Sequence, residues 1–141
     1  MSKTIVDFYL GSDGPTIRID AQETSAIEIL VRAFERLSSR VGEVIDLAVV
    51  PEFTFLDSIG SLVLRSVPSP VSKKVLQTAQ EKDVPGFEWR GTTHDWTDAR
   101  DFTIPLLQGS PSHQYLSSGP LNDDAIVEIA IMEPRPAWLS G

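Results

Sequence analysis

Hydrophobic residues change their spacing along the chain, and the first part has the spacing of β-strands. Residues 4–10 are β-branched and aromatic, turn residues occupy 11–15, and residues 16–20 alternate apolar and polar side chains. A period of two is typical of a strand with one buried face, so this region predicts a β-hairpin. In the second strand, Arg18 and Asp20 are expected on the face that meets water.

Between residues 21 and 40 the spacing changes to that of an amphipathic helix. Apolar residues recur there every three or four positions. Asp20, with Glu23 three residues later, predicts a capping box at the start, and Gly42 stands just past the end. The apolar stripe consists of Ile27, Leu30, Val31, Phe34, Leu37 and Val41.

The middle of the chain predicts short strands. Residues 43–50 are strongly apolar in their second half, which is typical of a central strand buried on both faces. Residues 59–67 and 87–90 also favour strands. Residues 71–83 fit either a short helix or a polar strand, and we favour the helix.

The last third predicts one helix and a final pair of strands. Residues 92–108 have helical spacing, and Pro105 limits that helix to its first part. Residues 112–117 and 125–133 predict a terminal antiparallel pair. The tail at 134–141 contains prolines and is expected to extend over the surface.

These elements predict an α+β fold. We expect an antiparallel or mixed sheet of about five to seven strands, with one long helix (about 21–40) packed on a face and one or two short helices. No segment repeats at a fixed period and no stretch has the composition of a linker, so residues 1–133 are expected to form a single domain, followed by the tail 134–141.

Composition excludes several classes of function. The 141 residues include 12 Lys and Arg against 20 Asp and Glu, for a formal net charge of −8, which disfavours binding to nucleic acid. The chain has no cysteine, so it has neither disulfides nor thiolate metal sites. The N-terminal residues lack an apolar run of signal-peptide or membrane-span length. We therefore expect a cytoplasmic protein that does not bind membranes.

Familiar catalytic and cofactor motifs are absent from the sequence. The glycine-rich patterns that bind phosphates and dinucleotides do not occur, and neither do the serine motifs of hydrolases and β-lactamases. We therefore expect no cofactor and no catalytic residue.

One polar constellation, around residue 94, has spacing that would suit a metal ion. His94, Asp98 and Asp101 are separated by four and three positions, so a helix would place them on one face. A histidine with two carboxylates can bind a divalent cation. The competing interpretation is a helix cap followed by a solvated face, and we favour it.

Several aromatic residues also stand out. His113 and Tyr115 project from the same face of their predicted strand, as residues in a binding surface or a packed pair would. Trp89 and Trp96 are expected in the core rather than in an exposed recognition pair.

The acidic charge is concentrated near the C-terminus. No Lys or Arg occurs between Arg100 and Arg135, and Glu128 is expected to face water there. Such a surface favours a basic protein partner. The residues expected to contact that partner are Asp123, Asp124, Glu128, His113, Tyr115 and Trp138.

Two functional hypotheses follow. The preferred one is a small acidic binding module without catalytic activity that presents an acidic and aromatic surface to a basic protein. Bacterial immunity and antitoxin proteins are similar in class, although no motif is shared. The alternative is a small-molecule-binding protein or metal-assisted enzyme that uses His94, Asp98 and Asp101, or His113 and Tyr115. Residues 49–55 could also form a homodimer interface.

Overall fold

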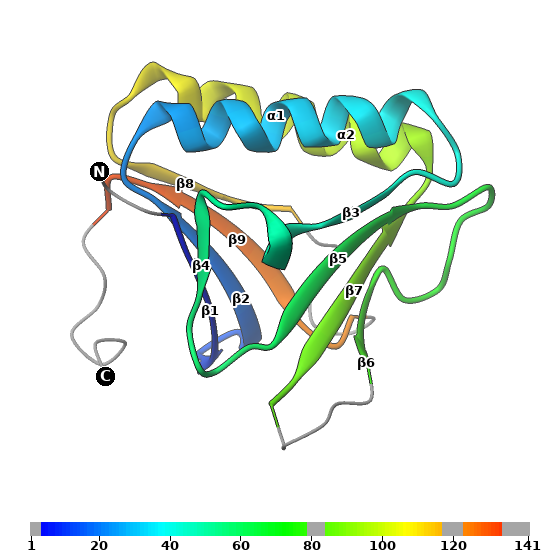
Figure 1. Cartoon of the computed structure of the whole chain (residues 1–141), viewed down its shortest axis with the longest axis horizontal. Coiled ribbons are helices and arrows are strands. Elements are labelled where there is room, and N and C mark those ends of the chain that lie inside the picture. Colours follow the sequence, from blue (N-terminus) through cyan, green and yellow to red (C-terminus); the bar gives the residue numbers. More distant parts are fainter. Residues whose placement is uncertain (1–3, 79–83, 117–122, 134–141) are drawn as a thin grey trace.

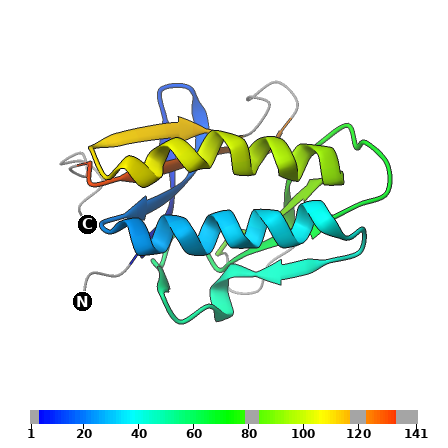
Figure 2. The same ribbon diagram turned by 90° about the horizontal axis from the view of Figure 1, so that it is seen from above.

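The computed structural model describes residues 4–78, 84–116 and 123–133. Two helices lie side by side and cover two β-sheets, which diverge below them (Figures 1 and 2), so the fold is α+β as predicted. The helices are α1 (Thr24–Ser39) and α2 (Thr93–Thr103), and the 3-10 turns are η1 (Leu47–Val49) and η2 (Ile104–Gln108). The strands are β1 (Thr4–Gly11), β2 (Gly14–Ala21), β3 (Val44–Asp46), β4 (Phe53–Phe55), β5 (Ser61–Ser66), β6 (Val75–Thr78), β7 (Gly86–Gly91), β8 (Ser112–Tyr115) and β9 (Ile126–Ile131).

The strands form two mixed sheets, so the prediction of one sheet is wrong. Sheet A has the order β4-β1-β2-β9-β8, and sheet B has the order β3-β5-β7-β6. In sheet A, β2 and β9 run parallel and join two antiparallel pairs; β5 and β7 do the same in sheet B. Periodicity within a strand reports which side chains are buried, but it does not report which strand lies alongside.

The two halves of the chain repeat one order of elements. Residues 4–66 and 75–131 each contain a hairpin, then a helix, then two further paired strands. The hairpin of one half is completed by the strand pair that follows the helix of the other half: β1 and β2 join β9 and β8, while β7 and β6 join β5 and β3. The first half has one further strand, β4, which pairs with β1. Each sheet therefore depends on both halves.

The long helix matches its predicted period but begins later than predicted. Its buried residues are Ala26, Ile27, Leu30, Ala33, Phe34 and Leu37. The N-cap is Glu23, which makes no side-chain capping bond, and Asp20 lies buried in β2 instead. Gly42 follows the helix with a φ of 92°, a conformation that glycine adopts without strain. In the described residues, no helix has the length and apolarity needed to cross a membrane.

Aromatic rings join the two helices to sheet B, and sheet B to sheet A. Phe34 of α1 stacks on Trp96 of α2 with ring centres 5.7 Å apart, and Trp96 lies 4.8 Å from Trp89 of β7. Phe8 of β1 contacts Phe87 of β7 at 5.0 Å, which links sheet A to sheet B. Trp89 and Trp96 are both buried, so their predicted place in the core is confirmed.

Two predicted segments fold differently. Residues 43–50 contain a strand only at Val44–Asp46, and this strand lies at the edge of sheet B. The carboxylate of Asp46 accepts a hydrogen bond from the N–H of Ala48 at 3.0 Å, and the chain turns there into η1. The helix favoured over 71–83 is also wrong, because Val75–Thr78 pairs with β7 as a strand.

Candidate functional site

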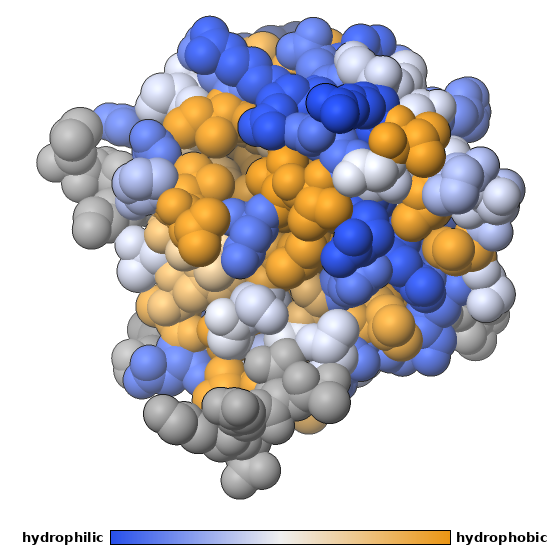
Figure 3. All heavy atoms as spheres, turned by 45° about the vertical axis from the view of Figure 1, so that its right-hand side comes forward, coloured by the Kyte–Doolittle hydropathy of each residue, from blue (hydrophilic) through white to orange (hydrophobic). Residues whose placement is uncertain are grey.

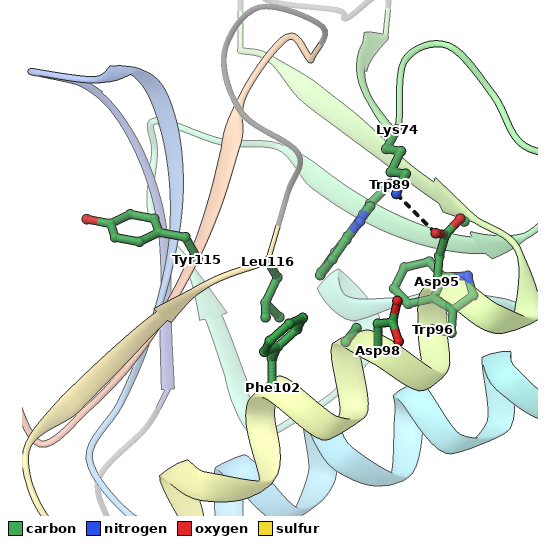
Figure 4. A pocket seen from close by; sticks show the side chains of 10 residues that line it. Lys74, Trp89, Asp95, Trp96, Asp98, Phe102, Tyr115 and Leu116 are labelled. Carbon is green, nitrogen blue, oxygen red and sulfur yellow. Dashed lines mark hydrogen bonds and ion pairs between the residues drawn. The ribbon is translucent and has the colours of Figure 1, made fainter.

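A cleft of about 180 Å³ opens between α2, β7 and the end of β8 (Figure 4). In the close-up, the side chains of Phe102 of α2 and Leu116 after β8 point toward each other and form one side of it, with Trp89 and Trp96 on the side of sheet B. The charged residues that line it are Lys74, Asp95 and Asp98. We call this the α2 cleft.

The close contact between α2 and β7 depends on Gly91. A Cβ atom at this position would lie 3.0 Å from the Cβ of Asp95 and 3.2 Å from Nε1 of Trp96. The indole N–H of Trp96 donates to the carbonyl of Arg65 at 3.2 Å, which holds the ring in place. A larger residue at position 91 would therefore push α2 away from sheet B and widen the cleft.

A capping box fixes the start of α2. Thr92 Oγ1 accepts the N–H of Asp95 at 3.2 Å, and Asp95 Oδ2 accepts the N–H of Thr92 at 2.9 Å. Asp95 also forms an ion pair with Lys74 Nζ at 3.0 Å. Burial would raise the pKa of Asp95, but the hydrogen bonds from Thr92 and Lys74 outweigh burial, and the pKa is lowered.

The three predicted metal ligands do not form a ligand set. His94 Nε2 lies 3.5 Å from Asp98 Oδ2, on the exposed side of α2. Asp101 instead pairs with Arg100, whose Nη2 lies 2.9 Å from Asp101 Oδ1. Within the described ranges, no group of three or more His, Asp or Glu side chains could hold a metal ion. Asp98 lies at the α2 cleft, with its side chain 52% exposed.

His113 and Tyr115 lie together, as predicted, on the outer face of sheet A. Their rings pack edge to face with centres 5.5 Å apart, and His113 Nδ1 lies 3.0 Å from Glu133. Burial and the nearby charge of Glu128 raise the pKa of Tyr115. Figure 4 shows the Tyr115 side chain directed away from Phe102 and Leu116, so it borders the α2 cleft without filling it.

Glu128 does not face water, and that prediction is wrong. It is only 4% exposed, and Arg18 Nη1 lies 3.4 Å from its carboxylate. The hydroxyl of Tyr9 donates to Glu128 at 3.1 Å, and burial together with this charge raises the pKa of Tyr9 to about 12. Arg18 and Asp20 are buried as well, so this face of β2 is not solvated as expected. The ion pair between Arg18 of β2 and Glu128 of the neighbouring strand β9 allows these charges to be buried.

Asp123 and Asp124 tie the segment before β9 to the edge of sheet B. Asp123 Oδ1 accepts the N–H of Lys74 at 2.8 Å, and Asp124 pairs with Lys73 Nζ at 2.8 Å. Asp124 also accepts the N–H of Gln77, and the hydrogen bond from Lys73 contributes most to lowering its pKa. These carboxylates have a structural role here; their role in binding a partner stays a prediction, and Trp138 lies outside the described residues.

The side of the molecule toward α1 has exposed apolar residues of its own. Val41, Val44 and Val49 lie before, in and after β3, and each is exposed. Figure 3 shows apolar surface gathered in the middle of this side, below a hydrophilic band. The predicted dimer edge at 49–55 belongs to this region, and its role as an interface stays a prediction.

Sequence reasoning missed Phe102, Leu116 and Lys74 as site residues. Phe102 falls on the apolar side of its predicted helix, so the pattern indicates burial, yet it is 56% exposed. Lys74 is held at the cleft by its ion pair with Asp95, which lies in a different element. An exposed phenylalanine beside acidic residues is the available signal, but exposure becomes visible only in the folded chain.

Comparisons of the chain with protein families, with curated proteins and with solved structures find no match.

Proposed function

We propose that this protein is a non-catalytic binding module that takes one long basic side chain of a protein partner into the α2 cleft. The observation that carries the proposal is the pairing of an exposed apolar wall with an exposed carboxylate at one small cleft. Phe102 and Leu116 supply the wall, and Asp98 supplies the charge. Arginine and lysine have an apolar stem and a cationic head, which match these two features.

The size of the cleft favours a side chain over a free ligand. Pockets for small molecules and cofactors usually measure about 300–1,000 Å³. The α2 cleft, at about 180 Å³, falls below that range. Protein interfaces often rest on a single side chain inserted into a pocket of this kind. This comparison supports the binding module over the alternative of a small-molecule-binding protein or enzyme.

Charge supports a cationic partner. The chain carries a formal net charge of −8 with His neutral, so its overall field attracts basic proteins. The side chain of Asp98 is 52% exposed at the cleft, so its carboxylate is accessible to a cation. The long-range field would raise the association rate, and the cleft would provide the contact.

The test uses a blocked hexa-arginine peptide and amide chemical shifts. We expect the shifts to change most at α2 and at Leu116, and we expect salt to weaken binding because exposed charges are screened. Replacing Asp98 with Asn, or Phe102 with Ala, should weaken binding about fivefold or more.

Glu28→Gln is the matched control, because Glu28 is an exposed acid on α1, away from the cleft. It removes the same charge as Asp98→Asn. Shift changes spread evenly over the surface, with equal effects of Asp98→Asn and Glu28→Gln, would show attraction by net charge alone and reject the proposal.

A further inference from the structure

We infer that the partner binds as an extended basic segment that adds a strand to sheet A along β8. This inference rests on the proposed function of the α2 cleft and specifies how the partner presents its basic side chain. The cleft then receives one side chain of the added strand, while main-chain hydrogen bonds hold the rest of the segment.

The free side of β8 has main-chain groups in position for such pairing. In the described part of the chain, β8 pairs with β9 and with no other strand. The N–H of Leu116 donates to the carbonyl of Val127 at 2.9 Å, so Leu116 faces β9. In an antiparallel ladder this direction alternates, and the N–H and C=O groups of His113 and Tyr115 therefore point away from β9.

The edge of sheet B along β6 is occupied by the chain itself. The N–H of Asp124 donates to the carbonyl of Val75 at 2.8 Å, and Asp123 and Asp124 accept the N–H groups of Val75 and Gln77. The outer side of β6 is thus covered by residues next to β9. The outer side of β8 has no such cover among the described residues, and an uncovered strand edge readily pairs with another chain.

The alternation of side chains connects this edge to the cleft. Leu116 lines the α2 cleft, and Gln114 shares its face of the strand. His113 and Tyr115 lie on the opposite face, where Tyr115 is 51% exposed. In a strand added beside β8, a side chain next to Leu116 would point toward Phe102 and Asp98. Its neighbours in sequence would lie beside Tyr115.

The charges around β8 select a basic segment. The carboxylate of Glu133 lies 3.0 Å from Nδ1 of His113 in β8. The carboxylates of Asp98 and Asp101 are both more than half exposed on α2. An acidic segment would be repelled here, whereas arginines or lysines at alternate positions would meet opposite charge.

The experiment compares three blocked pentapeptides of the sequence Arg-Val-Arg-Val-Arg. The first is unmodified, the second is N-methylated at its three arginines, and the third at its two valines. Only one of these sets of N–H groups can face β8 in an added strand. We expect one methylated peptide to bind about tenfold more weakly than the unmodified peptide, and the other to bind within about twofold of it.

Hydrogen exchange locates the contact. The amides of His113 and Tyr115 should exchange more slowly when the unmodified peptide is bound, while the amides of β3, the edge strand of sheet B, should not change. His113→Pro should weaken binding as much as the unfavourable methylation does. The substitution removes an N–H that points away from β9 and leaves the hydrogen bonds between β8 and β9 intact. His113→Ala is its control.

The outcomes separate this inference from the proposed function. If both methylated peptides bind equally, whether tightly or weakly, strand addition is wrong; shifts at Phe102 and Leu116 would then still support binding in the cleft. If the unmodified peptide shifts neither α2 nor β8, the proposed function and the inference both fail. Slower exchange at β3 in place of β8 would also overturn the inference.

Discussion

The α1 side and the α2 side of the molecule have the same order of elements but finish differently. After β3, the chain forms η1 and then β4, which pairs with β1 and so extends sheet A. Leu47 of η1 is 1% exposed, so this connection packs into the core. After β8, the corresponding position is held by Leu116, which is only partly buried at the α2 cleft. One architecture therefore gives a buried connection after β3 on one side and a cleft beside the end of β8 on the other.

The two helices differ in the same way. Six side chains of the 16-residue α1 are buried, whereas α2 buries Trp96, Ala99 and Thr103 and leaves Phe102 exposed. A helix that buries a full stripe contributes mainly to stability. A helix with an exposed aromatic residue next to a cleft is available for binding. We therefore propose that α1 belongs to a stabilising side of the molecule and α2 to a binding side.

The largest effect is expected from Leu47→Ala. Removing a fully buried leucine side chain should lower the free energy of unfolding by about 2–4 kcal/mol, because the transfer energy is lost and a cavity remains. Leu116→Ala is the matched change on the α2 side, and it should lower the free energy of unfolding by less than about 1 kcal/mol. Urea unfolding measures both. Equal losses would mean that the two sides do not differ in packing.

Gly91→Ala should have the next largest effect. The new Cβ would contact Asp95 and Trp96 too closely, which should cost about 1–3 kcal/mol of stability and displace α2. Gly42→Ala is the control that introduces backbone strain without a close contact. The φ of Gly42 is 92°, but no atom lies within 4 Å of the added Cβ. The near-ultraviolet circular dichroism of Trp96 should change only for Gly91→Ala; an unchanged spectrum would contradict the close contact.

Acid should weaken the α2 side through Asp95. The pKa of Asp95 is lowered in the folded protein. The stability that Asp95 contributes is therefore fully present above the pKa of the unfolded chain, near 3.9, and is lost as pH falls through the lower pKa of the folded protein. Lys74→Ala removes the partner and should reduce stability near neutral pH by about 0.5–1 kcal/mol, with a smaller difference from the wild type near pH 2. Urea unfolding between pH 6 and pH 2 measures the difference in the free energy of unfolding between the variant and the wild type. If this difference stays constant with pH, the ion pair is not its source.

The smallest effect on stability should come from Phe102→Ser. Because more than half of this side chain is exposed, we expect the free energy of unfolding to change by less than about 0.5 kcal/mol. Binding of hexa-arginine should nevertheless weaken about fivefold or more. A loss of stability comparable to that of Leu47→Ala would place Phe102 in the core and remove it from the binding side.

Local elements were predictable because their signals lie close together in the sequence. The stripe of α1, the opening hairpin and the end of α2 near Pro105 each depend on a few neighbouring residues. The sequence leaves residues 71–83 open between a helix and a polar strand, because Gln77 and Thr78 interrupt any apolar period. Strand β6 forms there through pairing with β7 and through hydrogen bonds to the carboxylates of Asp123 and Asp124.

The site was only partly predictable for a related reason. Glu128 carries the pattern of a solvated strand residue, and its burial becomes possible through Arg18, which lies 110 residues earlier. The sequence predicts a role for Asp98 only in the alternative with a metal ion. Its position beside Phe102 and Leu116 follows from the packing of α2 against β8 and β7, which no spacing in the sequence encodes.

The exchange of strand pairs between the halves has a consequence for how the chain unfolds. Neither half can complete a sheet by itself, so loss of one half removes the hydrogen-bonding partners of the other, and melting should occur in a single cooperative step. The same exchange should let a molecule cleaved between β5 and β6 stay together, and two separately produced fragments should recover their structure only when mixed.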